Sequence, residues 1–107
     1  MNWIEVAMIA TTPPESMSDE QGRPYFLWDV PAMTLDGFRR VLADPDPEVR
    51  AYWLGKLMRQ AKPDDVFLFV SVADLRRDWE RVDKHLGGRR AFWEWLLTRF
   101  REAGIGG

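Results

Sequence analysis

Apolar side chains recur at steps of three and four from residue 34 to residue 103, and prolines or glycines interrupt this pattern at intervals. Steps of three and four place side chains on one face of an α-helix, whereas a β-strand alternates with a period of two. Proline suits the first position of a helix, and glycine suits the position just after its end. The sequence therefore predicts an all-α fold, a small bundle of about five helices with short connections.

Side chains that suit a helix N-terminus precede the apolar stretches. Thr34 and Asp46 are good N-cap residues, and a proline follows Asp46 at the first helical position. Ser71, with Asp74 three residues later, resembles a capping box. The second half of the stretch 63–70 is β-prone, so a buried strand is the alternative to a short helix there. The predicted helices span residues 34–43, 46–61, 63–70, 71–86 and 89–103.

The N-terminal part of the sequence lacks the helical pattern. Residues 11–24, TTPPESMSDEQGRP, have the composition of a disordered linker, so residues 1–23 are predicted to be a flexible N-terminal arm and linker before a single helical domain at 24–107. The next stretch, PYFLWDV (24–30), lies between prolines that disfavour helix at the preceding positions, which predicts an extended aromatic N-terminal arm or one short strand. Phe26 and Trp28 alternate onto one side of an extended chain, so we expect both to dock on the helical body, or else on a partner.

The side chains that carry most enzyme chemistry are scarce. The chain has no cysteine and a single histidine, His85, near the end of a predicted helix. Asp44, Asp46, Asp64 and Asp65 stand at helix starts, where capping and the helix dipole account for them. No histidines or carboxylates show the spacing of metal ligands. We therefore expect a protein that is not an enzyme, with no catalytic residues, no cofactor and no metal site.

The sequence also bears on location. No apolar run approaches the roughly 20 residues that a membrane-spanning helix needs. The N-terminal run NWIEVAMIA is interrupted by Glu5 and follows no basic residue, unlike a signal peptide. The net charge of −2 argues against strong nonspecific binding to nucleic acid. We expect a cytoplasmic protein that does not bind membranes.

Two predicted helices carry more aromatic side chains than one buried face requires. Tyr52 and Trp53 are adjacent in the helix 46–61, so they lie on different faces. In the last helix we expect Phe92 and Trp95 to face the core, which leaves a second apolar stripe on another side. Aromatic side chains beside arginines are typical of interface hot spots, and the partner would be another protein or a second copy of the chain. The predicted partner-binding residues are Tyr52, Trp53, Trp93, Leu97, Arg89 and Arg90.

A helix-turn-helix that regulates transcription is the alternative interpretation. A short helix at 63–70, followed closely by the helix from Ser71, would present a basic face to DNA phosphates or base edges. The simpler interpretation is a solvated helix, because Arg76–Glu80 and Glu80–Lys84 are i,i+4 pairs. The residues that would bind DNA are Arg76, Arg77, Arg81 and Lys84.

Four segments, PYFLWDV, DPEVRAYWLGKLMRQA, PDDVFLFVSVADLRRDW and RRAFWEWLL, follow one another within residues 24–100. In these aromatic and turn positions the sequence resembles a group of short bacterial helical proteins that are often encoded beside nucleotidyltransferase-type (AbiEii-like) toxins. The resemblance implies an antitoxin-like or accessory protein whose partner is a toxin or a nucleotidyltransferase. It implies no role for any single residue.

Overall fold

The computed structural model describes residues 24–30 and 32–105, which form α-helices and 3-10 helices with no β-strand among them. The predicted all-α fold is confirmed, and the described part contains five α-helices. The flexible arm predicted at residues 1–23 lies outside the described residues. The α-helices are α3 (Leu35–Leu42), α4 (Pro47–Gln60), α5 (Pro63–Val66), α6 (Val72–Val82) and α7 (Arg90–Glu102), and the 3-10 helices are η1 (Tyr25–Leu27), η2 (Asp83–His85) and η3 (Gly87–Arg89).

The helix starts follow the capping side chains. The side chains of Thr34 and Asp46 each accept a hydrogen bond from a backbone N–H in the first turn of α3 and of α4. At the start of α6 the Ser71 hydroxyl accepts the Asp74 N–H at 3.1 Å, and the Asp74 carboxylate accepts the Ser71 N–H at 2.9 Å. This reciprocal pair satisfies two donors that the helix itself leaves open, and it confirms the predicted capping box.

The stretch 63–70 forms α5 and a turn rather than a strand. The helix predicted at 71–86 is α-helical only as far as Val82, and η2 and η3 continue the chain to Arg89. Val82 and Leu86, which flank η2, are both fully buried. Gly87 then turns the chain with a φ of 53°, which suits glycine.

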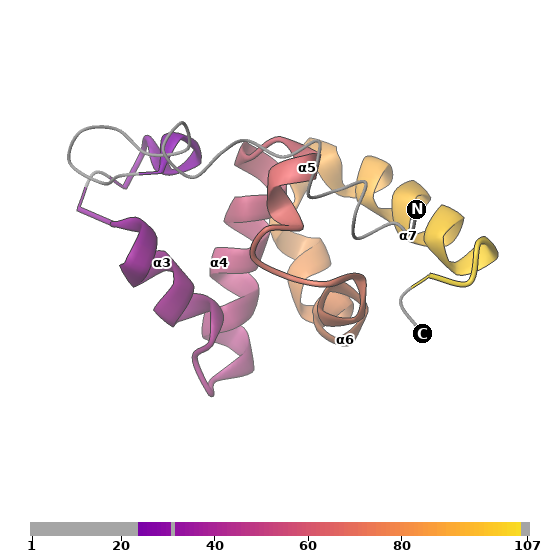
Figure 1. The fold of residues 1–107 in the computed structure, drawn as a ribbon, viewed down its shortest axis with the longest axis horizontal. Coiled ribbons are helices and arrows are strands. Elements are labelled where there is room, and N and C mark those ends of the chain that lie inside the picture. The colour runs from indigo at the N-terminus through magenta and orange to yellow at the C-terminus, as the bar shows by residue number, and fades with distance from the viewer. Residues whose placement is uncertain (1–23, 31, 106–107) are drawn as a thin grey trace.

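Helix α4 lies at the centre of the fold and contacts η1, α3, α5, α6, η2 and η3 (Figure 1). Five consecutive residues of α4, Leu54 to Met58, are buried, so this stretch has no solvent-facing side. Gly55 allows η2 to approach closely, because a Cβ atom there would lie 2.5 Å from the Cβ of His85. The central position explains why α4 carries apolar residues on more than one face.

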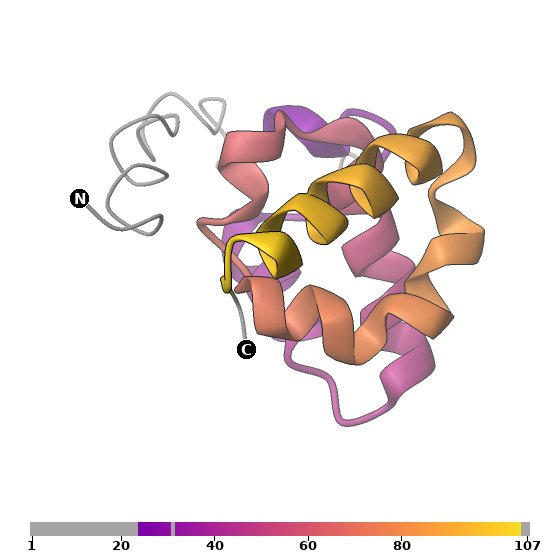
Figure 2. The same cartoon turned by 90° about the vertical axis from the view of Figure 1, so that its right-hand side faces the viewer.

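Helix α7 crosses one side of the bundle in front of α4 (Figure 2). Its inner face inserts Trp93, which is fully buried and donates its indole N–H to the carbonyl oxygen of Met58 at 2.8 Å. At the end of α7, Gly104 has a φ of 74° and the N–H of Ile105 donates to the carbonyl oxygen of Phe100 at 2.8 Å. This Schellman turn ends the helix at the glycine that the sequence indicates.

The expectation of an extended segment at 24–30 is wrong. Tyr25–Leu27 form a 3-10 helix, in which Phe26 and Leu27 are buried at 0% and 1% exposure. Phe26 packs edge-to-face on Phe38 and Phe69, with ring centroids 5.2 and 5.7 Å away. Trp28 is 73% exposed, so it does not share the buried side with Phe26. The reason is the period: alternate residues share one side of an extended chain but not of a helix with three residues per turn.

Candidate protein-binding surface

Trp28 is held in an exposed position by buried or bonded neighbours. Leu27, before it, lies in the core, and Asp29, after it, accepts hydrogen bonds from two side chains of α4. These are the ammonium of Lys56 at 2.5 Å and the amide of Gln60 at 3.4 Å. The indole is therefore presented to solvent from a segment that is fixed on both sides.

Lys56 is the polar centre of this region. The residue is only 5% exposed, yet its ammonium reaches the partly exposed carboxylate of Asp29. The hydrogen bond from Lys56 lowers the pKa of Asp29 below its ordinary value. The same ammonium lies 5.9 Å from the centroid of the Tyr52 ring, a cation–π distance. Lys56 thus connects the Trp28 segment to Tyr52.

Tyr52 is 48% exposed and lies between two other rings. Its ring meets Trp53 edge-on at 5.2 Å and His85 edge-on at 5.8 Å. Arg59 donates a hydrogen bond to the backbone carbonyl of His85 at 2.7 Å, which ties η2 to α4. Trp28, Asp29, Tyr52, Lys56, Arg59 and His85 together form what we call the Trp28–Tyr52 surface.

The predicted partner-binding residues divide between surface and core. Tyr52 is exposed as expected, whereas Trp53 is half-buried against Phe38, with ring centroids 6.4 Å apart. Trp93 and Leu97 are 0% and 5% exposed, so their assignment to a surface is wrong. Either stripe of α7 has helical spacing, and the sequence does not reveal which one faces α4.

The opposite face of α7 carries the exposed aromatic side chain instead. Trp95, expected in the core, is 54% exposed. It packs on the half-buried Phe92 with ring centroids 6.2 Å apart, and the Arg99 guanidinium lies 5.7 Å from its centroid.

The two predicted arginines near the start of α7 are exposed. Arg90 pairs with Asp83 at 3.3 Å and with Glu94 at 2.9 Å, and its guanidinium lies over the Trp79 ring. Arg89 is the last residue of η3 and the N-cap position of α7. The structure therefore does not bring these arginines into the Trp28–Tyr52 surface as defined.

The four cations of the DNA-binding alternative all have acceptors within the chain. Arg76 donates to the carbonyl oxygens of Leu97 and Ile105, at 3.2 and 2.7 Å, which ties α6 to the end of α7. Arg81 and Lys84 both pair with Glu48, at 3.4 and 3.3 Å. Arg77 pairs with Asp74 and Asp78. Lys84 lies in η2, beyond the end of α6.

A buried carboxylate that the sequence analysis did not single out lies between α4 and α6. Asp78 is 2% exposed and accepts hydrogen bonds from Arg50 and Arg77. Burial by itself would raise the pKa of Asp78, but the two guanidinium groups outweigh it and hold that pKa below its ordinary value. Hydrogen bonding to Asp78 raises the pKa of Arg77 in turn. The spacing of Asp78 from the buried Leu75 and Val82, three and four residues away, was the available signal.

A second buried carboxylate anchors η1. The Tyr25 hydroxyl donates to Asp65, which is 0% exposed, at 2.6 Å and accepts the Lys62 N–H at 2.9 Å. Burial and the hydrogen bond to Asp65 raise the pKa of Tyr25 to about 12. Asp65 therefore has a second role besides its place at a helix start. Its hydrogen bond with Tyr25 connects α5 to a segment 40 residues earlier in the chain.

Within residues 24–30 and 32–105, no three histidines, aspartates or glutamates are grouped so that they could hold a metal ion. In the same part of the chain, no helix has the length and apolar character to cross a membrane. Comparison of the chain with protein-family models, curated proteins and solved structures found no match.

Proposed function

We propose that this chain is a small, non-enzymatic protein-binding module that binds its partner through the Trp28–Tyr52 surface. The observation that carries the proposal is the position of Trp28, which is 73% exposed although Leu27 beside it lies in the core. Asp29 on its other side is held by Lys56 and Gln60. An exposed surface that combines large aromatic side chains, here Trp28 and Tyr52, is typical of sites where another protein binds.

The backbone of this surface is held in place within the chain itself. A partner gains the apolar area of Trp28 and Tyr52 without the entropic cost of fixing their backbone segments, since core packing and the Asp29–Lys56 pair hold them. Tryptophan, tyrosine and arginine are also the residues that dominate binding energy in protein interfaces. This surface contains all three residue types, because it includes the exposed Arg59 besides Trp28 and Tyr52.

The class of partner rests on the sequence resemblance. Segments that supply Trp28, Tyr52 and Lys56 resemble those of helical proteins encoded beside nucleotidyltransferase-type toxins. We therefore propose an antitoxin-like or accessory role, with the toxin or nucleotidyltransferase as the protein that covers the surface. The DNA-binding alternative has less support, because Arg76, Arg77, Arg81 and Lys84 all have intramolecular acceptors.

Co-expression with the products of the neighbouring genes tests this proposal. In this experiment the chain is expressed with an affinity tag, and the purified material is analysed by size-exclusion chromatography and mass spectrometry. We expect one neighbouring gene product to co-elute with the chain in a fixed ratio. Elution of the chain alone as a monomer, with the neighbouring products present in the lysate, would contradict the proposal.

A further inference from the structure

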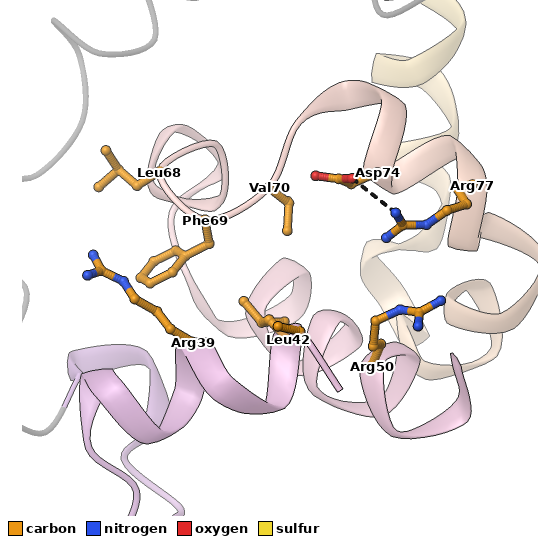
Figure 3. A pocket seen from close by; sticks show the side chains of 9 residues that line it. Arg39, Leu42, Arg50, Leu68, Phe69, Val70, Asp74 and Arg77 are labelled. Carbon is orange, nitrogen blue, oxygen red and sulfur yellow. Dashed lines mark ion pairs between the residues drawn. The ribbon is translucent and has the colours of Figure 1, made fainter. Parts of the chain in front are cut away.

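A cleft of about 560 Å³ opens between α3, residues 68–70 and the first turns of α4 and α6 (Figure 3). Its middle is apolar and is formed by Leu42, Phe69 and Val70. Arg39 stands at one end, and Arg50 and Arg77 stand at the other (Figure 3). The volume is in the range of about 300–1,000 Å³ that ligand-binding clefts occupy.

The cation at the first end is held without a carboxylate. The Arg39 guanidinium lies over the Phe69 ring, 5.6 Å from its centroid. Within the described part of the chain, no ion pair joins Arg39 to an aspartate or a glutamate. Its positive charge therefore remains open to a ligand, and the aromatic ring sets its position.

The cations at the other end are fixed but nearly balanced in charge. The buried Asp78 accepts hydrogen bonds from both Arg50 and Arg77, and Asp74 pairs with Arg77 at 3.4 Å. A guanidinium has five N–H donors, and the ion pairs of Arg77, which is 57% exposed, do not use all of them. This end therefore offers oriented donors rather than a strong positive field.

We propose that this cleft binds an acidic peptide segment of a protein partner, with a carboxylate on Arg39 and apolar side chains over Leu42 and Phe69. The second end takes a further carboxylate or a backbone carbonyl on Arg77. The apolar middle suits the aliphatic and aromatic side chains of a peptide. A single unbalanced cation also suits one carboxylate better than a row of phosphates.

The proposal goes beyond the Trp28–Tyr52 surface, with which the cleft shares no residue. The two can therefore fail separately. If no peptide binds in the cleft, the co-elution experiment still tests the first proposal independently.

Fluorescence anisotropy with the full chain tests the cleft. The probe is a short fluorescein-labelled peptide in which glutamates flank a leucine and a phenylalanine. We expect saturable binding of this peptide, and weaker binding of two matched peptides, one with glutamines in place of the glutamates and one with serines in place of the apolar residues. No saturable binding, or equal binding of the glutamine peptide, would overturn the proposal.

A matched pair of variants locates the binding. Arg39→Gln removes the guanidinium over Phe69, and Arg40→Gln removes its exposed neighbour, which does not line the cleft. Loss of a charge-assisted hydrogen bond should weaken peptide binding about 10-fold for Arg39→Gln. We expect Arg40→Gln to change it less than about 2-fold. Both variants should stay folded, since neither residue makes an ion pair within the described part and Arg39 loses only an exposed cation–π contact. Equal effects of the two variants, or Arg39-dependent binding of a labelled single-stranded oligonucleotide but not of the peptide, would contradict the peptide assignment.

Discussion

Two of the ion pairs that tie the central helix α4 to its neighbours differ in which member is buried. In the Arg50–Asp78 pair the carboxylate is buried, with a side-chain exposure of 2%, while Arg50 is 21% exposed. In the Lys56–Asp29 pair the ammonium is buried, at 6%, while the carboxylate is 32% exposed. When the buried member is replaced, the cost depends on how well water reaches the charge that remains, because a charge without a partner is costly only where water cannot solvate it.

The two pairs also differ in the surface feature that each one supports. Asp78 connects α4 to α6 and holds the two arginines at one end of the cleft. Lys56 belongs to the Trp28–Tyr52 surface and connects two of its segments. We therefore expect Asp78 to matter chiefly for folding and Lys56 chiefly for binding. Four variants test this division, in order of their expected effect on the free energy of unfolding.

Asp78→Asn should have the largest effect. An amide does not balance two guanidinium groups, and removal of one member of a buried pair is strongly destabilising. Because Arg77 remains in contact with water, we expect a loss of about 2–3 kcal/mol at neutral pH, at the low end for such pairs. Urea denaturation measures it. Asp83→Asn is the control, since it removes only a surface pair with Arg90 and should cost less than about 1 kcal/mol.

The effect of Asp78→Asn should depend on pH in a defined direction. The folded-state pKa of Asp78 is lowered, so its contribution is present above the unfolded pKa, near 4, and is lost as the pH falls through the folded value. The difference in stability between the original chain and the variant should therefore shrink below about pH 4. A difference that stays constant down to pH 2 would contradict the buried ion pair.

Tyr25→Phe should have an intermediate effect. It removes the hydroxyl that donates to the buried Asp65 and accepts the Lys62 N–H, which should cost about 1 kcal/mol. The pKa of Tyr25 is raised to about 12, so its contribution is fully present below the unfolded value of about 10 and is lost as the pH rises through the folded value. Spectrophotometric titration of the tyrosines checks the pKa directly. Tyrosine titrations that all lie near 10 would contradict this anchor.

Lys56→Met should change stability little. Methionine fills a similar volume, and replacement of a buried cation by an apolar group is often neutral. Asp29 is left 32% exposed or more, so water can solvate it, and we expect a change within about 1 kcal/mol. Partner binding should nevertheless weaken, because Lys56 no longer holds Asp29 beside Trp28. Melting curves and co-elution of the same preparation measure the two effects, and a large loss of stability would show that Lys56 serves the fold instead.

The local part of this architecture could be predicted from sequence. Thr34, Asp46 and the Ser71–Asp74 pair act within one helical turn, so their identity is sufficient to place the helix starts. The short helix after Lys62 follows from the same local rules, through a proline and two acidic residues in its first turn.

The parts that depend on distant contacts could not be predicted. Either stripe of α7 would suit a core, and the contact of Trp93 with Met58, 35 residues earlier, decides between them. For the candidate site, Tyr52 was predicted because large aromatic side chains are conspicuous in the sequence, whereas Trp28 was expected to dock beside Phe26 and is exposed instead. Their connection through Lys56 and Asp29 spans 27 residues and has no sequence signature.

The most direct test of the central claim compares Trp28→Ala with Trp95→Ala. Trp28 and Trp95 are 73% and 54% exposed, so neither variant should lower the melting temperature appreciably, and the smallest change is expected for Trp28→Ala. The quantity to measure is the affinity of each variant for the co-eluting gene product. Our account predicts a loss of about 30-fold or more for Trp28→Ala, as for a hot-spot residue, and less than about 3-fold for Trp95→Ala. Unchanged affinity of Trp28→Ala, or a melting temperature lowered by several degrees, would contradict the claim that Trp28 is an ordered, exposed anchor for a protein partner.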